Sequence, residues 1–569
     1  MKRAVLFSVL PLCVAAYAFF QTAPPAPRLA ALMPSGALLC LEAQNFGNLA
    51  RVWDTSQVKA DWLKSDSYSV FSRSNLFTKL QDVYGQYGEA AEFLPGLKGV
   101  MEIAGTESAL ALYDIRNVEF LYISRIGDAE IMKSQLWSIR DKFQQRQAGG
   151  VSFFLRTDPA SKRTVAFAFA KGFLLLATRD DLLAQALELL AGGSGPSIAS
   201  DRWYHDATVA AADAGELRMV MNFESLVKSV YFRSYWVQRN VSTIRRYWTG
   251  VADESRSGDN ITETRVFLRS PDAEAPPASG SATVSGLLPL IPPEAGFYKA
   301  WVGGESAATA ELIVEKLIGR QRQEKSNWRD APLAISLENR VGSEADLETH
   351  IDERPLPSGA AISDSLAAVQ TMVEKPAARA ALLVQSTSMT EGSFVKMPSV
   401  IVLEGAESWD LESVRNALVT AVGGLWTTSQ LGAHWIAGTA GRHSIERLDG
   451  LGALVFANRG RLLFLSNDAT LLAALMDRAG TSPIASALTY AAGFRYSRER
   501  SNYERIMKAL DFNGHPDGLQ MDHANDKPSF FSGNIASLSQ VLSRVSEIRV
   551  TEEERATVTV QTVLYHFGQ

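Results

Sequence analysis

Bulky and small apolar residues alternate between Val165 and Ala170, which predicts a β-strand because successive side chains of a strand point to opposite faces. Gly172 follows, with the freedom in φ that a hairpin turn needs. Residues 173–177 are apolar at almost every position, as expected of a strand that is covered on both faces. Leucine and alanine at helical spacing then predict a helix that ends at Gly192.

The same pattern occurs a second time, between Leu451 and Gly480. Pairing Gly172 with Gly460 and reading forward without a gap brings identical residues together: Leu174 and Leu462, Leu175 and Leu463, Asp180 and Asp468, Leu183 and Leu471, Leu187 and Leu475. Self-similarity at a long period indicates a duplicated structural unit. These residues fill a core and form turns, so the repeat predicts architecture and no chemistry.

Further apolar runs predict strands in both halves of the chain, at residues 37–41, 109–113, 120–125, 151–156, 261–268, 296–302, 400–403 and 556–564. Strands and helices alternate irregularly, and several strands are linked as hairpins. We therefore predict an α+β fold of two tandem, internally duplicated units, each a largely antiparallel sheet with packed helices.

Apolar stripes at helical spacing predict three amphipathic helices. One starts at Asp128 and another near Ser408, and the third is the last of several helical segments between Asn48 and Glu89. Their stripes are, in that order, Met132, Leu136, Ile139 and Phe143; Leu411, Val414, Leu418 and Val422; and Leu76, Leu80, Val83, Tyr84 and Tyr87.

Residues 271–286 have the proline, alanine and serine content of a linker, and they separate a first unit at 30–270 from a second unit at 287–569. Within the second unit, the stretch near 325–375 has acidic loops and short apolar patches that match nothing in the first. We predict an irregular insertion there.

The N-terminus has the layout of an export signal, because Lys2 and Arg3 precede an apolar run that reaches Phe20. A cleaved signal peptide and a retained membrane anchor over residues 1–20 both fit this run, which is short for a membrane span. Residues 21–29 follow as a Pro/Ala-rich tether. The sequence thus predicts an exported protein, either periplasmic or anchored in the inner membrane and facing the periplasm.

The order of leader, tether and two similar α+β halves resembles that of exported bacterial proteins of unknown function. The residues that carry this resemblance are the Leu-x-Pro openings at Leu32 and Leu290 and the Gly-x-Leu-Leu hairpins at Gly172 and Gly460. They are core and turn residues, so the resemblance implies a fold and export but assigns no catalytic position.

Composition describes an ordinary globular chain of 569 residues, 46% hydrophobic and 21% charged, which is long enough to bury a large core. Its formal net charge of −6 disfavours a nucleic-acid partner. Of the two cysteines, Cys13 lies in the leader and Cys40 just beyond it, so removal of the leader would leave no intramolecular disulfide.

Motif searches identify no catalytic or cofactor-binding constellation. The seven histidines form no His-Glu-x-x-His or Cys/His ligand pair. The weak metal candidates, spaced as in a calcium-binding loop, are Asp511, Asn513, His515 and Asp517, but Pro516 stands where that loop needs glycine. Ser-x-x-Lys occurs at Ser56 and Ser225 without the partner motifs of serine acyl-transfer enzymes, which is typical of chance. We predict no metal and no cofactor.

Residues 225–248 are predicted to form a helix of about six turns with an apolar seam. On its other faces the candidate interaction residues are Tyr235, Trp236, Arg239, Arg245 and Arg246. Arginine beside aromatic residues suits a protein interface or an anionic ligand. Burial of this helix on two sides is the alternative explanation.

The leading functional prediction is a non-catalytic exported envelope protein that acts as a binding or assembly module, with an envelope protein or an anionic or apolar ligand as its partner. A periplasmic carrier of a lipid or other apolar ligand is the first alternative. The second is a hydrolase whose catalytic residues form no recognisable motif, because catalytic triads are defined by geometry. The identity of the ligand and the oligomeric state are left open.

Overall fold

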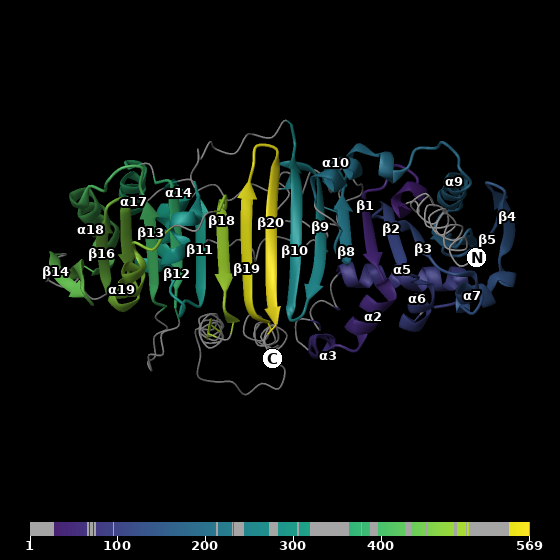
Figure 1. Cartoon of the computed structure of the whole chain (residues 1–569), viewed down its shortest axis with the longest axis horizontal. Helices are drawn as coiled ribbons and strands as arrows, with labels where there is room; N and C mark the ends of the chain where they lie inside the picture. The colour runs from purple at the N-terminus through teal and green to yellow at the C-terminus, as the bar shows by residue number, and fades with distance from the viewer. Residues whose placement is uncertain are drawn as a thin grey trace, which may run out of the picture.

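The computed structural model describes residues 28–567 except for the segments 65–67, 69–71, 73–74, 95, 212–213, 230, 233–243, 272–282, 304–305, 319–363, 377, 387–396, 427–433, 450–452, 483–485, 497 and 500–544. The described chain is an elongated α+β molecule built on a 20-stranded antiparallel sheet, which extends from β4 at one end to β14 at the other (Figure 1). The predicted α+β class and its antiparallel sheet are confirmed.

Ten strands in the first half of the chain and ten in the second make up the sheet. The first half contains β1 (Leu39–Gln44), β2 (Glu107–Asp114), β3 (Glu119–Arg125), β4 (Gln144–Ala148), β5 (Val151–Thr157), β6 (Thr164–Ala170), β7 (Phe173–Ala177), β8 (Leu217–Met221), β9 (Tyr247–Ser257) and β10 (Asn260–Arg269). The second half contains β11 (Phe297–Val302), β12 (Ala380–Gln385), β13 (Ser399–Glu404), β14 (His434–Ala440), β15 (His443–Asp449), β16 (Leu454–Arg459), β17 (Leu462–Ser466), β18 (Tyr490–Phe494), β19 (Val545–Glu554) and β20 (Val558–Phe567).

The two halves share one strand order. From the outer edge inward, the first half reads β4-β5-β6-β7-β3-β2-β1-β8-β9-β10. The second reads β14-β15-β16-β17-β13-β12-β11-β18-β19-β20, so each strand corresponds to the strand numbered ten higher. Pairing of β10 with β20 joins the halves into one sheet.

Side-chain contacts across the β10–β20 joint add to its backbone ladder. Arg265 Nη1 donates to Gln561 Oε1 at 2.9 Å, and the Arg269 guanidinium pairs with Glu554. Tyr247 Oη and Thr559 Oγ1 lie 3.3 Å apart. The first half therefore contacts the second along a continuous, hydrogen-bonded strand pair.

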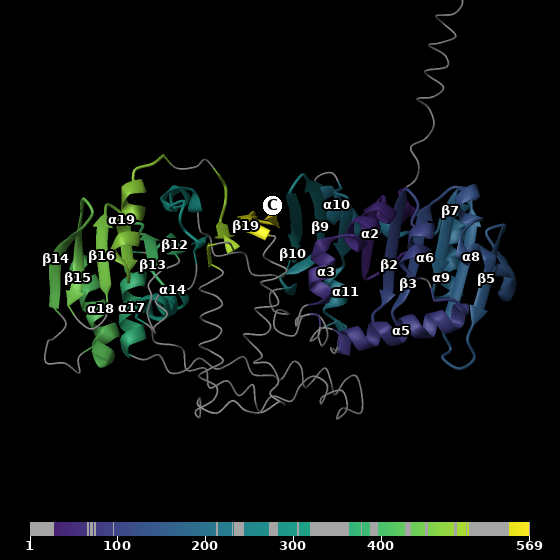
Figure 2. The ribbon, with the colours of Figure 1, turned by 90° about the horizontal axis from the view of Figure 1, so that it is seen from below.

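Helices cover both faces of the sheet in each half. On one face of the first half lie α9 (Asp180–Leu190) and α10 (Arg202–Ala210), and on the other lie α5 (Asn75–Ala91), α7 (Asp128–Ile131) and α8 (Gln135–Ser138). Helix α5 runs across the strand direction toward β5 and β6 (Figure 2). The remaining named α-helices are α2 (Phe46–Asp54), α3 (Gln57–Leu63), α6 (Leu97–Ile103), α11 (Phe223–Leu226), α14 (Ser306–Ile313), α17 (Asp364–Glu374), α18 (Leu411–Trp426) and α19 (Ala469–Arg478).

The repeated hairpins are present, but the ungapped alignment of the two stretches is wrong by one residue. Ala170 pairs with Phe173 and Arg459 with Leu462, so the two turns are Lys171-Gly172 and Gly460-Arg461. Leu175 packs in the cluster that contains α9, whereas Leu463, its partner in the ungapped alignment, packs on the face opposite α19. The glycines occupy different positions of their turns, and a one-residue shift places a strand residue on the other face.

Two predicted helical stripes differ from the structure. The single helix from Asp128 is instead two short helices, because the Ser134 hydroxyl accepts a hydrogen bond from Trp137 N and starts α8 anew. Met132 is 57% exposed as a result. In α5, Val83 is buried but Leu80 and Tyr84 are exposed, so the apolar face is narrower than predicted.

The α18 stripe is confirmed, because Val414, Leu418 and Val422 are all buried. The stretch that was predicted to be irregular near 325–375 falls mostly outside the described residues. Its described end forms α17, which buries Val369 and Met372. This helix lies between β11 and β12, where the first half has the helices between β1 and β2.

The predicted long helix over residues 225–248 differs from the structure at both of its ends. Residues 231, 232 and 244 are helical, whereas residues 230 and 233–243 lie outside the described part of the chain. Asn222 caps the short α11 through Ser225 N, α11 ends at Leu226, and Trp248 belongs to strand β9. Strand β19, the equivalent of β9 in the second half, begins at Val545. Over short runs, the alternate burial of residues in a strand resembles the three- and four-residue spacing of a helix. Long-range strand pairing then decides whether such a run forms a strand or a helix.

Candidate functional site

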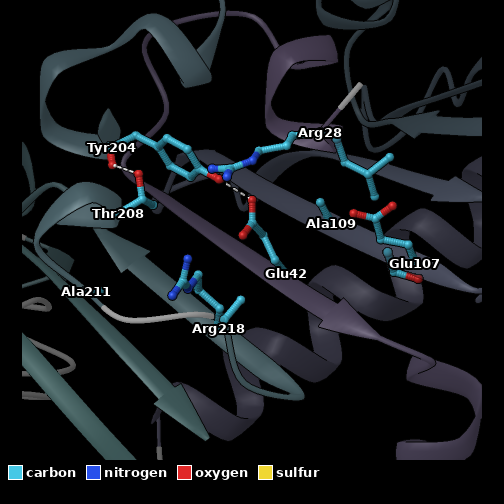
Figure 3. Close-up of a pocket in the computed structure, with 11 residues that line it drawn as sticks. Arg28, Glu42, Glu107, Ala109, Tyr204, Thr208, Ala211 and Arg218 are labelled. Carbon is cyan, nitrogen blue, oxygen red and sulfur yellow. Dashed lines mark hydrogen bonds between the residues drawn. The ribbon is translucent and has the colours of Figure 1, made fainter. Parts of the chain in front are cut away.

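A polar pocket of about 500 Å³ opens on the face of the first half that α10 covers. Strands β1, β2 and β8 form its floor, and α10 forms one wall (Figure 3). Its polar lining side chains are Arg28, Glu42, Glu107, Ser108, Tyr204, Thr208 and Arg218. We call it the first-half pocket. Its size falls within the range of small-molecule sites.

Strand register places three charged residues in a row across the pocket floor and the strand beyond it. Glu42 on β1 lies directly opposite Arg218 on β8, and Arg218 lies directly opposite Asp253 on β9. Opposed residues of neighbouring strands share a face, with Cβ atoms about 5 Å apart. We call these three residues the charged row. Residues far apart in the sequence thus meet through antiparallel pairing.

Arg218 and Asp253 neutralise each other within the charged row. Nε and Nη2 of Arg218 donate to the two carboxylate oxygens of Asp253 at 2.7 and 2.8 Å, in a bidentate ion pair. The two side chains are 7% and 11% exposed. A buried guanidinium needs such a partner, because an uncompensated charge in the interior is strongly destabilising.

Glu42 has no ion-pair partner among the described residues, although it faces the same pocket. The Tyr204 hydroxyl donates a hydrogen bond to its Oε1 (Figure 3). Burial raises the pKa of the Glu42 carboxyl, and the opposing influence of Tyr204 and of the arginines does not cancel this effect. Burial also raises the pKa of the Tyr204 hydroxyl, so this hydroxyl stays protonated as a donor. The pocket therefore holds a carboxyl group whose charge is poorly compensated.

Helix α10 is held in place by Asp201, which precedes it. Asp201 Oδ2 accepts from Gly36 N and from Trp203 Nε1, both at 3.2 Å, and its Oδ1 accepts from the Ser35 hydroxyl. On the sheet side, Thr249 Oγ1 donates to Trp203 O at 2.8 Å. These bonds fix the helix that positions Tyr204 over Glu42.

Two further charged residues, Glu107 and Arg28, line the pocket. Glu107 Oε2 accepts from Arg125 Nε at 3.2 Å, so its charge is compensated. The side chain of Arg28 is exposed and has neither a hydrogen bond nor an ion pair within the described part of the chain. It is close enough to Glu42 to lower the pKa of that carboxyl, yet the two groups form no ion pair.

The fold itself does not require these charges, as the corresponding positions of the second half show. The register of β11, β12, β18 and β19 makes Ala300, Ala380, Ala491 and Thr551 equivalent to Glu42, Glu107, Arg218 and Asp253. The three alanines lie in one apolar cluster with Val284 and Leu287, which are fully buried. Where the first half has a polar pocket, the second half has an apolar core.

The interaction residues predicted from the sequence do not form this site. Tyr235, Trp236 and Arg239 lie outside the described residues, as do the weak metal candidates Asp511, Asn513, His515 and Asp517. Arg245 and Arg246 are exposed in the turn that leads into β9, and their carbonyls accept from Ser270. Neither arginine lines the first-half pocket.

Sequence reasoning missed Glu42, Arg218 and Asp253. A signal existed, because Glu42 interrupts the apolar run 39–43 and Arg218 stands among the apolar residues of 217–221. Charged residues inside apolar strands are rarely buried without a partner. However, nothing in the local pattern indicates that these three positions are neighbours.

The other candidate reactive residues have structural roles. Ser56 caps α3 by accepting from Lys59 N at 3.1 Å, and Lys228 pairs with Glu224 instead of Ser225. The hydroxyl of Ser108, which lines the first-half pocket, donates to Ala104 O. Within the described residues there is no group of three or more His, Cys, Asp or Glu arranged to hold a metal ion. The helices of this part of the chain all lack the length and apolarity of a membrane span.

Comparison with solved structures finds crystal forms of TP0453, a bacterial exported protein. Crystal form I is 11% identical with a TM-score of 0.25, and the match covers 44% of this chain and 82% of that chain. Crystal form III is 12% identical with a TM-score of 0.25, and the match covers 45% of this chain and 83% of that chain. This weak resemblance carries no argument about function. No protein-family model matches the sequence, and no curated protein does.

Proposed function

We propose that the protein is a non-catalytic, exported binding module whose first half holds a small polar ligand in the first-half pocket. The observation that carries this proposal is the contrast between equivalent positions of the two halves. Charged residues at 42, 107, 218 and 253 correspond to Ala300, Ala380, Ala491 and Thr551. Burying charge is costly, so a fold that closes without it has another reason to retain it.

A polar ligand is favoured over the apolar cargo of a lipid carrier because of what lines the pocket. Arg28, Glu42 and Arg218 present charged groups to it. Apolar ligands are held instead in sites lined mainly by hydrophobic side chains. A pocket in the described part of the second half, beside Ser306, Thr309 and Glu374, has a volume of about 220 Å³.

The same comparison supports an origin of the two halves from one ten-stranded unit, after which the first half retained or acquired the charged residues of its pocket. Ten strands can be arranged in a sheet in many different orders, so two unrelated halves would rarely adopt the same order. Export rests on the basic, apolar leader at residues 1–20. Fractionation of the producing cells tests this part, and recovery of the chain in the cytoplasm would contradict it.

Native mass spectrometry of the full-length protein, released gently from its own cells, tests the binding function. We expect a bound species small enough for the pocket, and we expect it to be lost in the Glu42→Gln variant. Glu407→Gln, at an exposed position of the second half, is the matched control and should retain it. A protein that carries no ligand and is stabilised by none in a panel of small polar metabolites would contradict the proposal.

A further inference from the structure

The charges around the first-half pocket are compensated in pairs, with two exceptions. Arg218 is paired with Asp253, and Arg125 with Glu107. Arg28 and Glu42 have no ion-pair partner among the described residues, and they form none with each other. The pocket thus presents one positive and one negative group that form no ion pair with each other.

The Glu42 carboxylate can accept a hydrogen bond from a ligand in the pocket. The Tyr204 hydroxyl binds Oε1 and holds the carboxyl in place. Arg218, on the adjacent strand, is turned to Asp253 by its bidentate bond. A carboxylate that accepts a single hydrogen bond has capacity for further donors, and an ammonium group supplies three.

Arg28 is suited to the opposite kind of group. Its guanidinium is always charged and offers a planar fork of donors that matches carboxylate or phosphate. It precedes the 3₁₀ turn at Leu29–Leu32, which packs on α9 and β2, so the backbone at the rim of the pocket is anchored. The side chain is exposed and can reach a ligand without leaving an ion pair.

We propose that the first-half pocket binds a small zwitterion, with its ammonium group at Glu42 and its carboxylate or phosphate group at Arg28. This inference rests on the proposed binding function. A ligand with both charges compensates both groups at once, whereas a ligand with one charge leaves the other group without a partner. Free amino compounds and the head group of an amino phospholipid share this chemistry.

Isothermal titration of the full-length protein tests the proposal with a matched set of probes. The zwitterions are 5-aminopentanoic acid, glycylglycine and phosphoethanolamine, and the single-charge analogues are pentylamine and pentanoic acid. Glucose is the neutral polar probe. We expect at least one zwitterion to bind at least tenfold more tightly than either analogue, a difference of about 1.4 kcal/mol. Preference for phosphoethanolamine indicates a lipid head group, and preference for the other two indicates a free amino compound.

Two variants separate the contributions of the two ends of the ligand. Glu42→Gln should reduce the affinity for the zwitterion at least tenfold without reducing the affinity for pentanoic acid. Arg28→Met should also reduce the affinity for the zwitterion at least tenfold, without reducing the affinity for pentylamine. Glu407→Gln and Arg447→Met, both at exposed positions of the second half, should change neither. Zwitterion binding that is unaffected by both pocket variants would overturn the assignment.

The remaining outcomes distinguish this inference from the proposed function. Glucose that binds as tightly as the zwitterions, and depends on Glu42, would overturn the zwitterion and leave the binding function standing. If no probe binds, the ligand that stays bound to the protein in native mass spectrometry provides the test. A retained ligand that carries both charges supports the inference, and a retained ligand of any other kind overturns it. Absence of both probe binding and a retained ligand would overturn both proposals.

Discussion

Glu42 illustrates, at the scale of a single residue, a charged group at a position where the fold itself requires none. It occupies a sheet position that the second half fills with Ala300, and burial raises the pKa of its carboxyl. A group whose ionised form is disfavoured by the folded protein lowers stability when it is ionised. Residues that serve binding at the expense of stability are common at functional sites.

Replacement of Glu42 by glutamine should therefore stabilise the protein at neutral pH. Because the folded-state pKa is raised above the ordinary value of 4.5, the folded chain holds more protons than the unfolded chain between the two pKa values. Stability of the wild type then falls as pH rises through that window, and glutamine lacks this dependence. We expect Glu42→Gln to raise the free energy of unfolding by about 0.5–2 kcal/mol at pH 7 and by less at pH 4.

Denaturant titrations of both proteins at pH 4 and pH 7 provide the measurement. Glu407→Gln, on the surface, serves as the control and should show no comparable change between the two pH values. An equal effect of Glu42→Gln at both pH values would mean that the Glu42 carboxyl is not destabilised when ionised.

The Arg218–Asp253 pair gives a second prediction at this scale. Arg218→Ala or Asp253→Thr alone should lower the free energy of unfolding by about 3–5 kcal/mol, because each leaves a buried charge without its partner. The double variant reproduces Ala491 and Thr551 of the second half and should be less destabilised than either single variant. Chemical denaturation of the three variants measures this, and a double-variant loss equal to the sum of the single losses would contradict it.

At the scale of elements, α10 is the part of the first half that converts a sheet surface into a pocket. It packs on β8 and β9 and carries Tyr204 and Thr208 into the pocket wall. Between β17 and β18, the corresponding part of the second half, the described residues form α19 and no second helix. The presence of this helix therefore distinguishes the polar pocket of the first half from the apolar core of the second.

Asp201→Ala should loosen α10 and weaken ligand binding. The substitution removes acceptors for Ser35, Gly36 N and Trp203 Nε1, and it should lower stability by about 1–3 kcal/mol. Asp206→Ala, on the exposed side of the same helix, removes only surface contacts and should cost about 0.5 kcal/mol or less. Hydrogen exchange across residues 202–210 measures the effect, and equal protection in the two variants would contradict it.

At the scale of the whole molecule, the β10–β20 ladder makes two ten-stranded halves into one sheet. Nine directly opposed residue pairs form it, from Asn260 with His566 to Leu268 with Val558. Corresponding strands of the two halves meet there in antiparallel orientation. The half with the polar pocket and the half with the apolar core are thereby joined in one sheet.

A disulfide across this joint is a direct test. Thr264 and Thr562 are directly opposed, so cysteines at both positions should have the Cα separation that a disulfide requires. We expect the Thr264→Cys, Thr562→Cys double variant to form this bond within one chain upon mild oxidation, as mapped by peptide mass spectrometry. Thr264→Cys combined with Thr559→Cys is out of register and should not cross-link, and efficient cross-linking of that control would contradict the register.

Much of the architecture could be predicted from local pattern. The α18 stripe, the hairpin strands near Gly172 and Gly460 and the α+β class were all read correctly, because burial on one face leaves a periodic signature. The failures occurred where periodicity was ambiguous or interrupted. Trp248 fitted a helical spacing but belongs to a strand, and Ser134 divided a helix whose stripe continued past it.

The candidate site could not be predicted in the same way. Glu42, Arg218 and Asp253 come from three separate segments, and only the pairing of β1 with β8 and of β8 with β9 makes them neighbours. The sequence by itself determined the elements, since alternation and helical spacing are local properties. The tertiary structure decided which elements adjoin and in what register, because strand pairing depends on packing between distant segments. The charged row, and with it the pocket, exists only at that level.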